Sequence, residues 1–186
     1  IAYTLAAIDL FKKRSDYEVD VALNTDSNRL KNMIAEYPEV LIIERKEEHA
    51  TDTAGKMSVI RHSYQEAKRM QSKEYDYVID LDLTSPLRTV EDIFNLIEKK
   101  KTFPELDVVF SVVESRRNPY FNMVKEEGES VSLVNTSAFT SRQEAPIIYD
   151  MNASMYLYDP IFLQDNEYIF NGKCGVIQMK DYMVLD

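Results

Sequence analysis

Apolar residues recur with two different periods that alternate along the chain as far as Val113. Helical spacing predicts helices over residues 1–14, over 28–37, over the segment that carries Met57, Ile60 and Tyr64, and over 90–100. Short runs rich in branched apolar residues predict strands over 19–23, 40–43, 77–81 and 106–113. Helices that alternate with strands in this way indicate a mostly parallel sheet with helices on both faces.

The pattern changes after Glu114. Residues 121–125 and 131–134 flank Glu126-Glu127-Gly128-Glu129, which predicts an antiparallel hairpin. Residues 137–150 show no regular period, and they are followed by predicted strands over 153–158 and 176–179 with a short helix over 160–164 between them. We therefore expect one domain, residues 1–186, in which about 115–160 form a subregion with the hairpin.

The stretch from Tyr77 to Thr89 combines a strand, a polar loop and the start of a helix. Thr89 is the predicted N-cap of that helix, with Asp92 three residues later as in a capping box. Asp80 and Asp82 lie two residues apart, so their side chains point to the same face of the strand. Ligands of open α/β proteins bind at the carboxyl edge of the sheet, where this loop would lie. We expect the strand to be central, paired in parallel and buried from both sides.

Composition and charge narrow the classes of partner. The chain has 186 residues, 45% of them hydrophobic, and a formal net charge of -10, which argues against nucleic acid as a partner. No apolar run approaches the roughly 20 residues of a membrane-spanning helix. Cys174 is the only cysteine, which favours a cytoplasmic protein. His49 and His62 show no metal-ligand spacing, so we expect surface or loop side chains.

Neither end of the chain carries the signals that usually bound a domain. The helix from Ile1 begins without a capping residue, and Val184-Leu185-Asp186 are followed by no closing element. We expect further residues on both sides.

Short polar blocks in a fixed order resemble those of a known enzyme family. The blocks are Asn24-Thr25-Asp26, Asp52-Thr53-Ala54, Leu83-Thr84-Ser85-Pro86-Leu87-Arg88-Thr89, and Arg142-Gln143 with Pro146 and Asn152. In this order they resemble the acylneuraminate cytidylyltransferases, which are the CMP-sialic acid synthetases and their bacterial relatives. The T-S-P-L-R-T block is the most specific of these, and the resemblance runs along nearly the whole chain.

The resemblance implies an α/β, Rossmann-like three-layer nucleotidyltransferase fold with a mostly parallel sheet. It implies that the anomeric hydroxyl of a nine-carbon 2-ulosonic acid attacks the α-phosphate of CTP, giving a CMP-sugar and pyrophosphate, with Mg²⁺ as cofactor. Such in-line transfer depends on positioning and on neutralising phosphate charge. The resemblance also implies a homodimer built by residues of about 115–160. The family's phosphate-binding loop would precede Ile1, so we expect the fragment alone to be inactive.

Binding roles for individual residues also follow from the resemblance. Arg45 and Lys56 match nucleotide-binding positions. The sugar-binding positions are those of Asp82, Thr84, Ser85, Arg142, Gln143, Asn152 and Tyr156, with Arg142 reaching the sugar from the partner subunit. Asp186 matches the first of two metal-binding acids that follow the last strand. No residue is assigned to the catalytic step itself.

Two residues depart from the pattern of the sialic acid enzymes. Asp82 stands where those enzymes usually have Gln, and Asp150 stands where some relatives have Arg. Each change removes a hydrogen-bond donor for the carboxylate or acetamido group of a sialic acid. N-acetylneuraminate and a bacterial relative, legionaminic-like or pseudaminic-like, are both open as substrates.

Two other interpretations of the sequence compete with a cytidylyltransferase. In a nucleotide-sugar glycosyltransferase, Asp80-Leu81-Asp82 would be a metal-binding D-x-D motif, which leaves the T-S-P-L-R-T block unexplained. We rank sugar recognition by Asp82 ahead of metal binding. A third interpretation is a catalytically inactive interaction domain.

Overall fold

A computed structural model describes residues 1–46, 55–136, 139 and 142–180. Helices and strands alternate up to β4, and the later elements include a hairpin and a long returning strand. In chain order they are α1 (Ala2–Arg14), β1 (Val21–Thr25), α2 (Asn28–Ile34), β2 (Val40–Glu44), α3 (Lys56–Gln71), β3 (Val78–Leu81), α4 (Val90–Thr102), β4 (Val108–Glu114), β5 (Val124–Glu127), β6 (Ser130–Leu133), η2 (Arg142–Glu144), β7 (Tyr149–Tyr158), α5 (Pro160–Asp165), η3 (Ile169–Asn171) and β8 (Cys174–Gln178).

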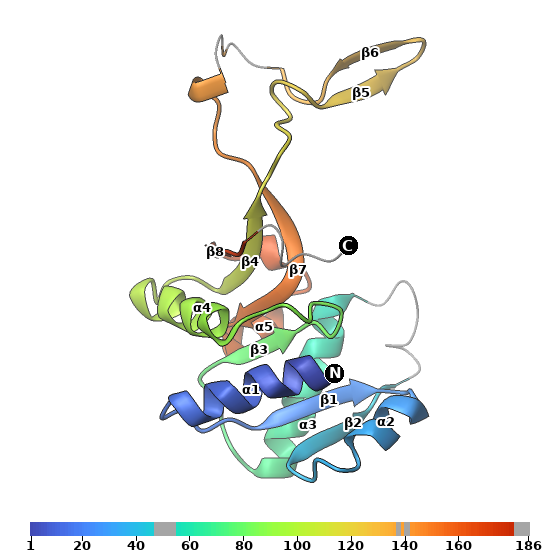
Figure 1. The fold of residues 1–186 in the computed structure, drawn as a ribbon, viewed down its shortest axis with the longest axis vertical. Coiled ribbons are helices and arrows are strands. Elements are labelled where there is room, and N and C mark those ends of the chain that lie inside the picture. Colours follow the sequence, from blue (N-terminus) through green and yellow to red (C-terminus); the bar gives the residue numbers. More distant parts are fainter. Residues whose placement is uncertain (47–54, 137–138, 140–141, 181–186) are drawn as a thin grey trace.

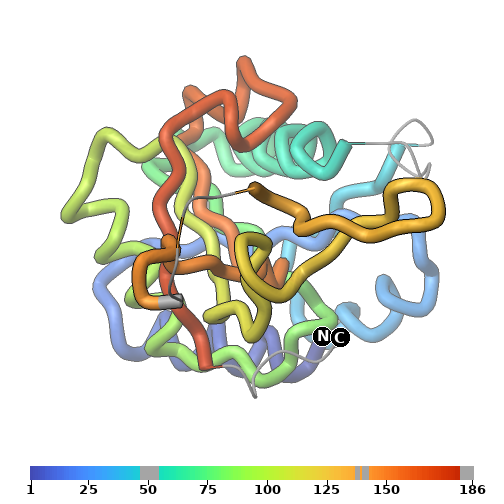
Figure 2. Tube along the Cα trace, turned by 90° about the horizontal axis from the view of Figure 1, so that it is seen from above, coloured from blue at the N-terminus to red at the C-terminus, as the bar shows by residue number. Residues whose placement is uncertain are grey.

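The strands of the main body form two hydrogen-bonded sheets between layers of helices. β1 pairs in parallel with β2, and a second sheet has the order β3-β7-β4-β8. In that sheet β8 is parallel to β4, and β7 runs antiparallel to both of its neighbours. Figure 2 shows α3 on one side of the strands and α1 on the other. This arrangement confirms the three-layer α/β fold.

The predicted environment of β3 is wrong. β3 is the edge strand of its sheet and pairs only with β7, in antiparallel register, and its side chains are half-buried rather than enclosed from both sides. The physical reason is non-local, because β7 returns from the far part of the chain and inserts between β3 and β4. Alternation of helices and strands alone predicted a central β3 with parallel pairing.

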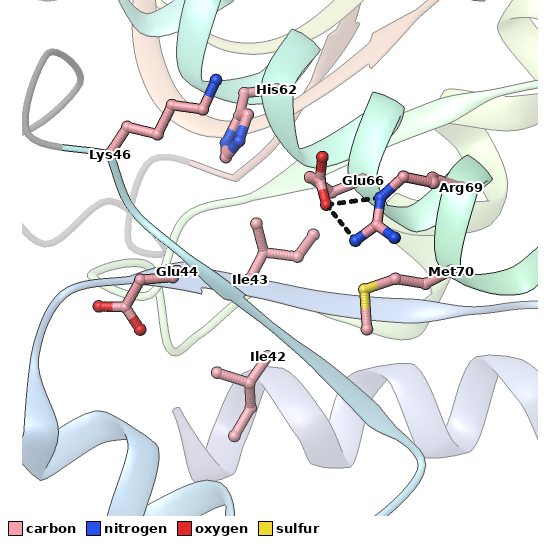
Figure 3. Close-up of a pocket in the computed structure, with 8 residues that line it drawn as sticks. All are labelled: Ile42, Ile43, Glu44, Lys46, His62, Glu66, Arg69 and Met70. Atoms are coloured by element: carbon pink, nitrogen blue, oxygen red, sulfur yellow. Dashed lines mark hydrogen bonds and ion pairs between the residues drawn. The ribbon is translucent and has the colours of Figure 1, made fainter.

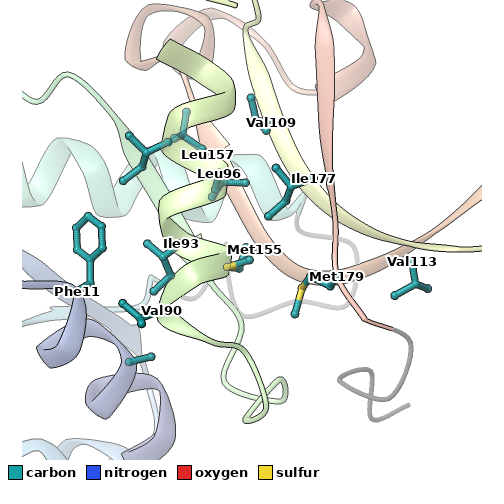
Figure 4. Packing of buried hydrophobic residues seen from close by; sticks show 12 residues of the cluster. Phe11, Val90, Ile93, Leu96, Val109, Val113, Met155, Leu157, Ile177 and Met179 are labelled. Atoms are coloured by element: carbon teal, nitrogen blue, oxygen red, sulfur yellow. The ribbon is translucent and has the colours of Figure 1, made fainter. Parts of the chain in front are cut away.

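Alternate residues of β4 and β7 point to the two helical layers. Val109 and Leu157 pack against α1 and α4 in one core cluster, which Figure 4 shows around Phe11, Ile93 and Leu96. The residues next to them in sequence point the other way, toward α3 and α5. This second cluster contains Met57, Ile60, Tyr64, Val108, Phe110, Tyr156, Tyr158, Phe162 and Leu163. The strands thus follow the two-residue period of a sheet covered on both faces.

Side-chain caps mark the first residues of α2 and α4 but not of α3. Ser27 caps α2 through a hydrogen bond that its side chain accepts from the Leu30 backbone N–H. The capping box of Thr89 and Asp92 is present at the start of α4. The N-cap of α3 is Gly55, which makes no side-chain capping hydrogen bond. None of the described helices is long and apolar enough to cross a membrane.

A long arm extends from the body and ends in the β5–β6 hairpin (Figure 1). β4 and β7 leave the body together, and the chain between them carries the hairpin and η2. Gly128 in the hairpin turn has φ +67, a left-handed conformation that favours glycine. Residues 115–160 therefore contain both the arm and the part of β7 that lies within the main sheet.

Candidate functional site

Charged and aromatic side chains meet at the carboxyl end of β3. Asp80 lies opposite Tyr156 in the register of β3 and β7, and the face of Tyr156 is the one covered by α3. Lys56, the first residue of α3, places Nζ 2.8 Å from Asp80 Oδ2 and 4.5 Å from the centroid of the Tyr156 ring. Three segments far apart in the sequence thus form one polar group.

Asp82 is held as a carboxylate by the loop that follows it. Its Oδ1 accepts hydrogen bonds from the backbone N–H and the hydroxyl of Thr84, each at 2.8 Å. Burial alone would raise the pKa of Asp82, but the two bonds from Thr84 and the charges of Lys56 and Arg88 outweigh it and lower that pKa. An ionised Asp82 accepts hydrogen bonds and donates none.

Arg88 lies beneath the same loop and is only 6% exposed. Its Nη2 donates to the main-chain oxygens of Asp82 and Ser85, the latter at 3.2 Å. Nη1 is buried and has no hydrogen-bond partner among the described residues. Burial lowers the pKa of Arg88, while the carboxylates of Asp82, Asp80 and Asp92 oppose that change. From the sequence, Arg88 was identified only as part of the T-S-P-L-R-T block, and no role was predicted for it.

Tyr156 forms the apolar floor of this polar group. Its ring stacks on Tyr158 at 6.0 Å and lies 5.8 Å from the ring of Phe110. Burial raises the pKa of Tyr156, the Lys56 ammonium opposes the rise, and Asp80 and Asp82 add to it. The hydroxyl therefore stays protonated at neutral pH.

The structure places Asn152 in a buried irregularity of β7 instead of on an open surface. The register of β4 and β7 shifts between Phe110 and Val112. Asn152 Oδ1 accepts from Ser111 Oγ at 2.6 Å and from the backbone N–H of Ser154 at 3.2 Å. Ala153 between them has φ +52. These contacts show Asn152 holding the shape of β7 four residues before Tyr156.

Arg45 belongs to a second polar group, at the end of β1. Its Nε donates to Asn24 Oδ1 at 3.1 Å, and its Nη2 donates to the Asn24 main-chain oxygen at 3.0 Å. Asn24 in turn contacts Ser63 Oγ at 3.0 Å and His62 Nδ1 at 3.2 Å. His62 is buried, so its expected surface position is wrong. α3 connects the two polar groups, because Lys56 and Ser63 lie seven residues, about 10 Å, apart along its axis.

Of the remaining predicted residues, Thr84 and Ser85 lie in the loop after β3, whereas Arg142 and Gln143 do not approach β3 within one chain. Arg142 and Gln143 lie in η2, beside the hairpin on the arm and away from β3 (Figure 1). Thr84 is exposed, and Ser85 is buried with only 8% exposure. Asp186, the predicted metal ligand, lies outside the described residues.

Comparisons with known proteins identify the family. Post-translational flagellin modification protein B of Campylobacter coli is 31% identical over 188 residues, covering 100% of this chain and 77% of that protein. CMP-N,N'-diacetyllegionaminic acid synthase of Campylobacter jejuni subsp. jejuni serotype O:2 is 31% identical over 166 residues, covering 89% of this chain and 70% of that protein. The chain belongs to the acylneuraminate cytidylyltransferase family. No family model matches it.

Solved structures show that the fold is shared more widely than the family. CMP:2-keto-3-deoxy-manno-octonic acid synthetase, solved with CTP, has a TM-score of 0.60 at 13% identity and covers 94% of this chain and 78% of that one. The 4-diphosphocytidyl-2C-methyl-D-erythritol synthase of Anaerococcus prevotii has a TM-score of 0.62 at 13% identity, covering 98% and 80%. Because the identity is only 13%, these two structures show that this chain has the nucleotidyltransferase fold, and they show nothing about its substrates.

The carboxylates of this cytidylyltransferase do not form a metal site within the described part of the chain. Across those residues no group of three or more His, Cys, Asp or Glu side chains is arranged to hold a metal ion. Asp80 is ion-paired with Lys56, and one oxygen of Asp82 already accepts two hydrogen bonds. Protein groups therefore contact both acids of the D-x-D spacing.

An open hollow of about 480 Å³ lies between β2 and α3 (Figure 3). It combines an apolar floor with charged side chains at its rim, including the Glu66–Arg69 ion pair. The lining residues are Ile42, Ile43, Glu44, Lys46, His62, Glu66, Arg69 and Met70. None of them belongs to the predicted sugar or nucleotide set, so this hollow is separate from the group at β3.

Proposed function

We propose that the protein joins CTP and an acidic nonulosonic sugar, giving a CMP-sugar and pyrophosphate. The observation that carries the proposal is the 31% identity, along 89% of this chain, with a CMP-N,N'-diacetyllegionaminic acid synthase. The group at the end of β3 supports it, because a carboxylate, an ammonium and an aromatic face suit a polar, acidic sugar.

In this proposal the two polar groups have different ligands. Arg45, which Asn24 fixes through two hydrogen bonds, would contact the nucleotide, as the family resemblance implies. Asp82 offers acceptor capacity beyond its two bonds from Thr84, so it suits a hydroxyl or amide N–H of the sugar. Thr84 and Ser85 lie in the same loop, which Arg88 fixes from below.

The proposal also includes a homodimer and magnesium. Arg142 and Gln143 lie on the arm, away from β3 in the same chain, so a second chain must supply them if they contact sugar. Arg142 would then present a fixed cation to an acidic group. Magnesium would neutralise charge on the triphosphate, and no described residue is assigned as its ligand.

A pyrophosphate-release assay on the full-length protein tests the reaction. CTP would be combined with a panel that includes N-acetylneuraminate and N,N'-diacetyllegionaminic acid. We expect pyrophosphate only when CTP and a nonulosonic acid are both present, and no release when UTP replaces CTP. Failure with every acid of the panel, in dimeric full-length protein with Mg²⁺, would contradict the proposal.

A further inference from the structure

Lys56 contacts Tyr156, one of the residues predicted for the sugar, and Asp80 beside it, whereas Arg45, the other predicted nucleotide residue, bonds to Asn24. We propose that the Lys56 ammonium binds the carboxylate of the sugar and that Asp80 is the positioning residue that holds it there. This inference rests on the proposed function and departs from the nucleotide role that the resemblance gave to Lys56.

The geometry fixes the ammonium at one place while leaving part of it accessible. Asp80 Oδ2 is buried and accepts no hydrogen bond from the described residues, and its 2.8 Å contact with the Lys56 ammonium is an ion pair. Tyr156 presents its ring face to the same ammonium, an arrangement that favours a cation. The Lys56 side chain is nevertheless 46% exposed, and an ammonium has three donors. Donors remain for an anion that approaches from solvent.

The surrounding charges favour one carboxylate over a triphosphate. Asp80 and Asp82 both lie within electrostatic reach of the Tyr156 ring, above which Lys56 sits. The repulsion from these two carboxylates grows with the charge of the ligand, so a triphosphate would meet much more of it than a single sugar carboxylate, which the Lys56 ammonium attracts. An acidic sugar also carries hydroxyl and amide donors that Asp82 can accept. The group therefore offers a donor and an acceptor side by side.

Substitution of Lys56 by Met tests this contact in the full-length protein. With CTP and N,N'-diacetyllegionaminic acid, we expect Lys56→Met to raise the KM for the sugar about tenfold or more and to change the KM for CTP less than about twofold. Lys68→Met is the matched control, because Lys68 lies on the same helix, pairs with Glu74 at 2.6 Å and is 40% exposed. It should leave both KM values unchanged.

A second variant separates binding from folding. Lys56→Met leaves the buried Asp80 oxygen without its partner and so destabilises the protein. The double variant Lys56→Met/Asp80→Asn removes that unpaired charge, so it should regain stability while keeping the raised KM for the sugar. If the double variant instead restores the wild-type KM, Lys56 only neutralises Asp80 and the proposal is wrong.

An uncharged probe tests the carboxylate directly. The C1 methyl ester of the same sugar, used as a competitor, should bind wild type and Lys56→Met equally, whereas the free acid should prefer wild type. A rise in the KM for CTP with no change for the sugar would assign Lys56 to the nucleotide and overturn the inference. If wild type releases no pyrophosphate, the proposed function fails, and calorimetry of the free acid with both proteins still tests Lys56.

Discussion

Arg88 donates a hydrogen bond to the main-chain oxygen of Asp82, six residues earlier in the chain. A second bond, to the Ser85 main-chain oxygen, closes the loop over the buried guanidinium. The loop that carries the predicted sugar residues is therefore shaped by a charged side chain underneath it. Arg88 bonds to backbone atoms of the loop. These two bonds therefore do not depend on which side chains stand at positions 82 and 85.

Replacement of Arg88 by Met should destabilise the protein by about 2–4 kcal/mol, because one buried and one partly buried main-chain oxygen lose their donor. Urea denaturation measures the change. Arg14→Met is the control, since Arg14 forms an exposed ion pair with Glu91 and should change stability by less than about 1 kcal/mol. Equal losses in the two variants would contradict the role given to Arg88.

Thr84→Val should make the free energy of unfolding less dependent on pH in the acidic range. The pKa of Asp82 is lowered in the folded protein, so its contribution is complete above the ordinary Asp pKa of about 3.9 and is lost as pH falls through the folded value. Removing the Thr84 hydroxyl weakens that lowering. The stability gap between wild type and Thr84→Val, measured by urea denaturation, should therefore be largest near neutral pH and narrow below about pH 4. The gap for the exposed control Thr102→Val should not vary with pH.

Asp82→Asn distinguishes sugar recognition from metal binding. If Asp82 accepts hydrogen bonds from the sugar, the variant should raise the KM for the sugar and leave the magnesium dependence of the rate unchanged. Initial rates with varied sugar and varied Mg²⁺ measure both effects. A shifted magnesium requirement at constant KM for the sugar would show that Asp82 acts through the metal.

Thr89→Ala should destabilise the protein by about 1 kcal/mol, because it removes one half of the capping box. Thr89 Oγ1 contacts Asp92 Oδ2 at 2.7 Å and accepts from the Asp92 backbone at 3.3 Å. Thermal or urea denaturation checks the value. Thr102→Ala, at the exposed end of the same helix, should lie within about 0.5 kcal/mol of wild type. An equal effect of the two changes would refute the capping role.

Features set by nearby residues could be predicted from the sequence, and features set by distant ones could not. The Thr89–Asp92 box and the turn at Gly128 depend on spacings of a few residues, and both are present. The position of β3 depends on β7, which lies about 70 residues further along and could not be placed by local periodicity. Likewise the pairing of Lys56 with Asp80 arises only because α3 packs on the face of β7 that carries Tyr156.

One face of the β5–β6 hairpin carries three apolar side chains and one carboxylate, although the hairpin stands away from the body (Figure 1). Val124 pairs with Leu133, and Glu126 pairs with Val131, so these four side chains share a face. Val124 and Val131 are 60% and 63% exposed. The opposite face carries Lys125, Glu127, Ser130 and Ser132. A two-stranded hairpin with one uncovered apolar face is marginally stable alone, so we expect a second subunit to cover it.

Val131→Glu should therefore weaken the dimer of the full-length protein, because it replaces an apolar side chain of this face with a second carboxylate, directly opposite Glu126. Light scattering at micromolar concentration should show dimeric wild type and a shift toward monomer in the variant. Ser132→Glu adds the same charge one residue away on the polar face and should remain dimeric. The variant's monomer should also bind the sugar more weakly, because η2 with Arg142 would no longer reach the partner's group at β3. Monomeric wild type, or equal dissociation of both variants, would contradict an interface on this face of the hairpin.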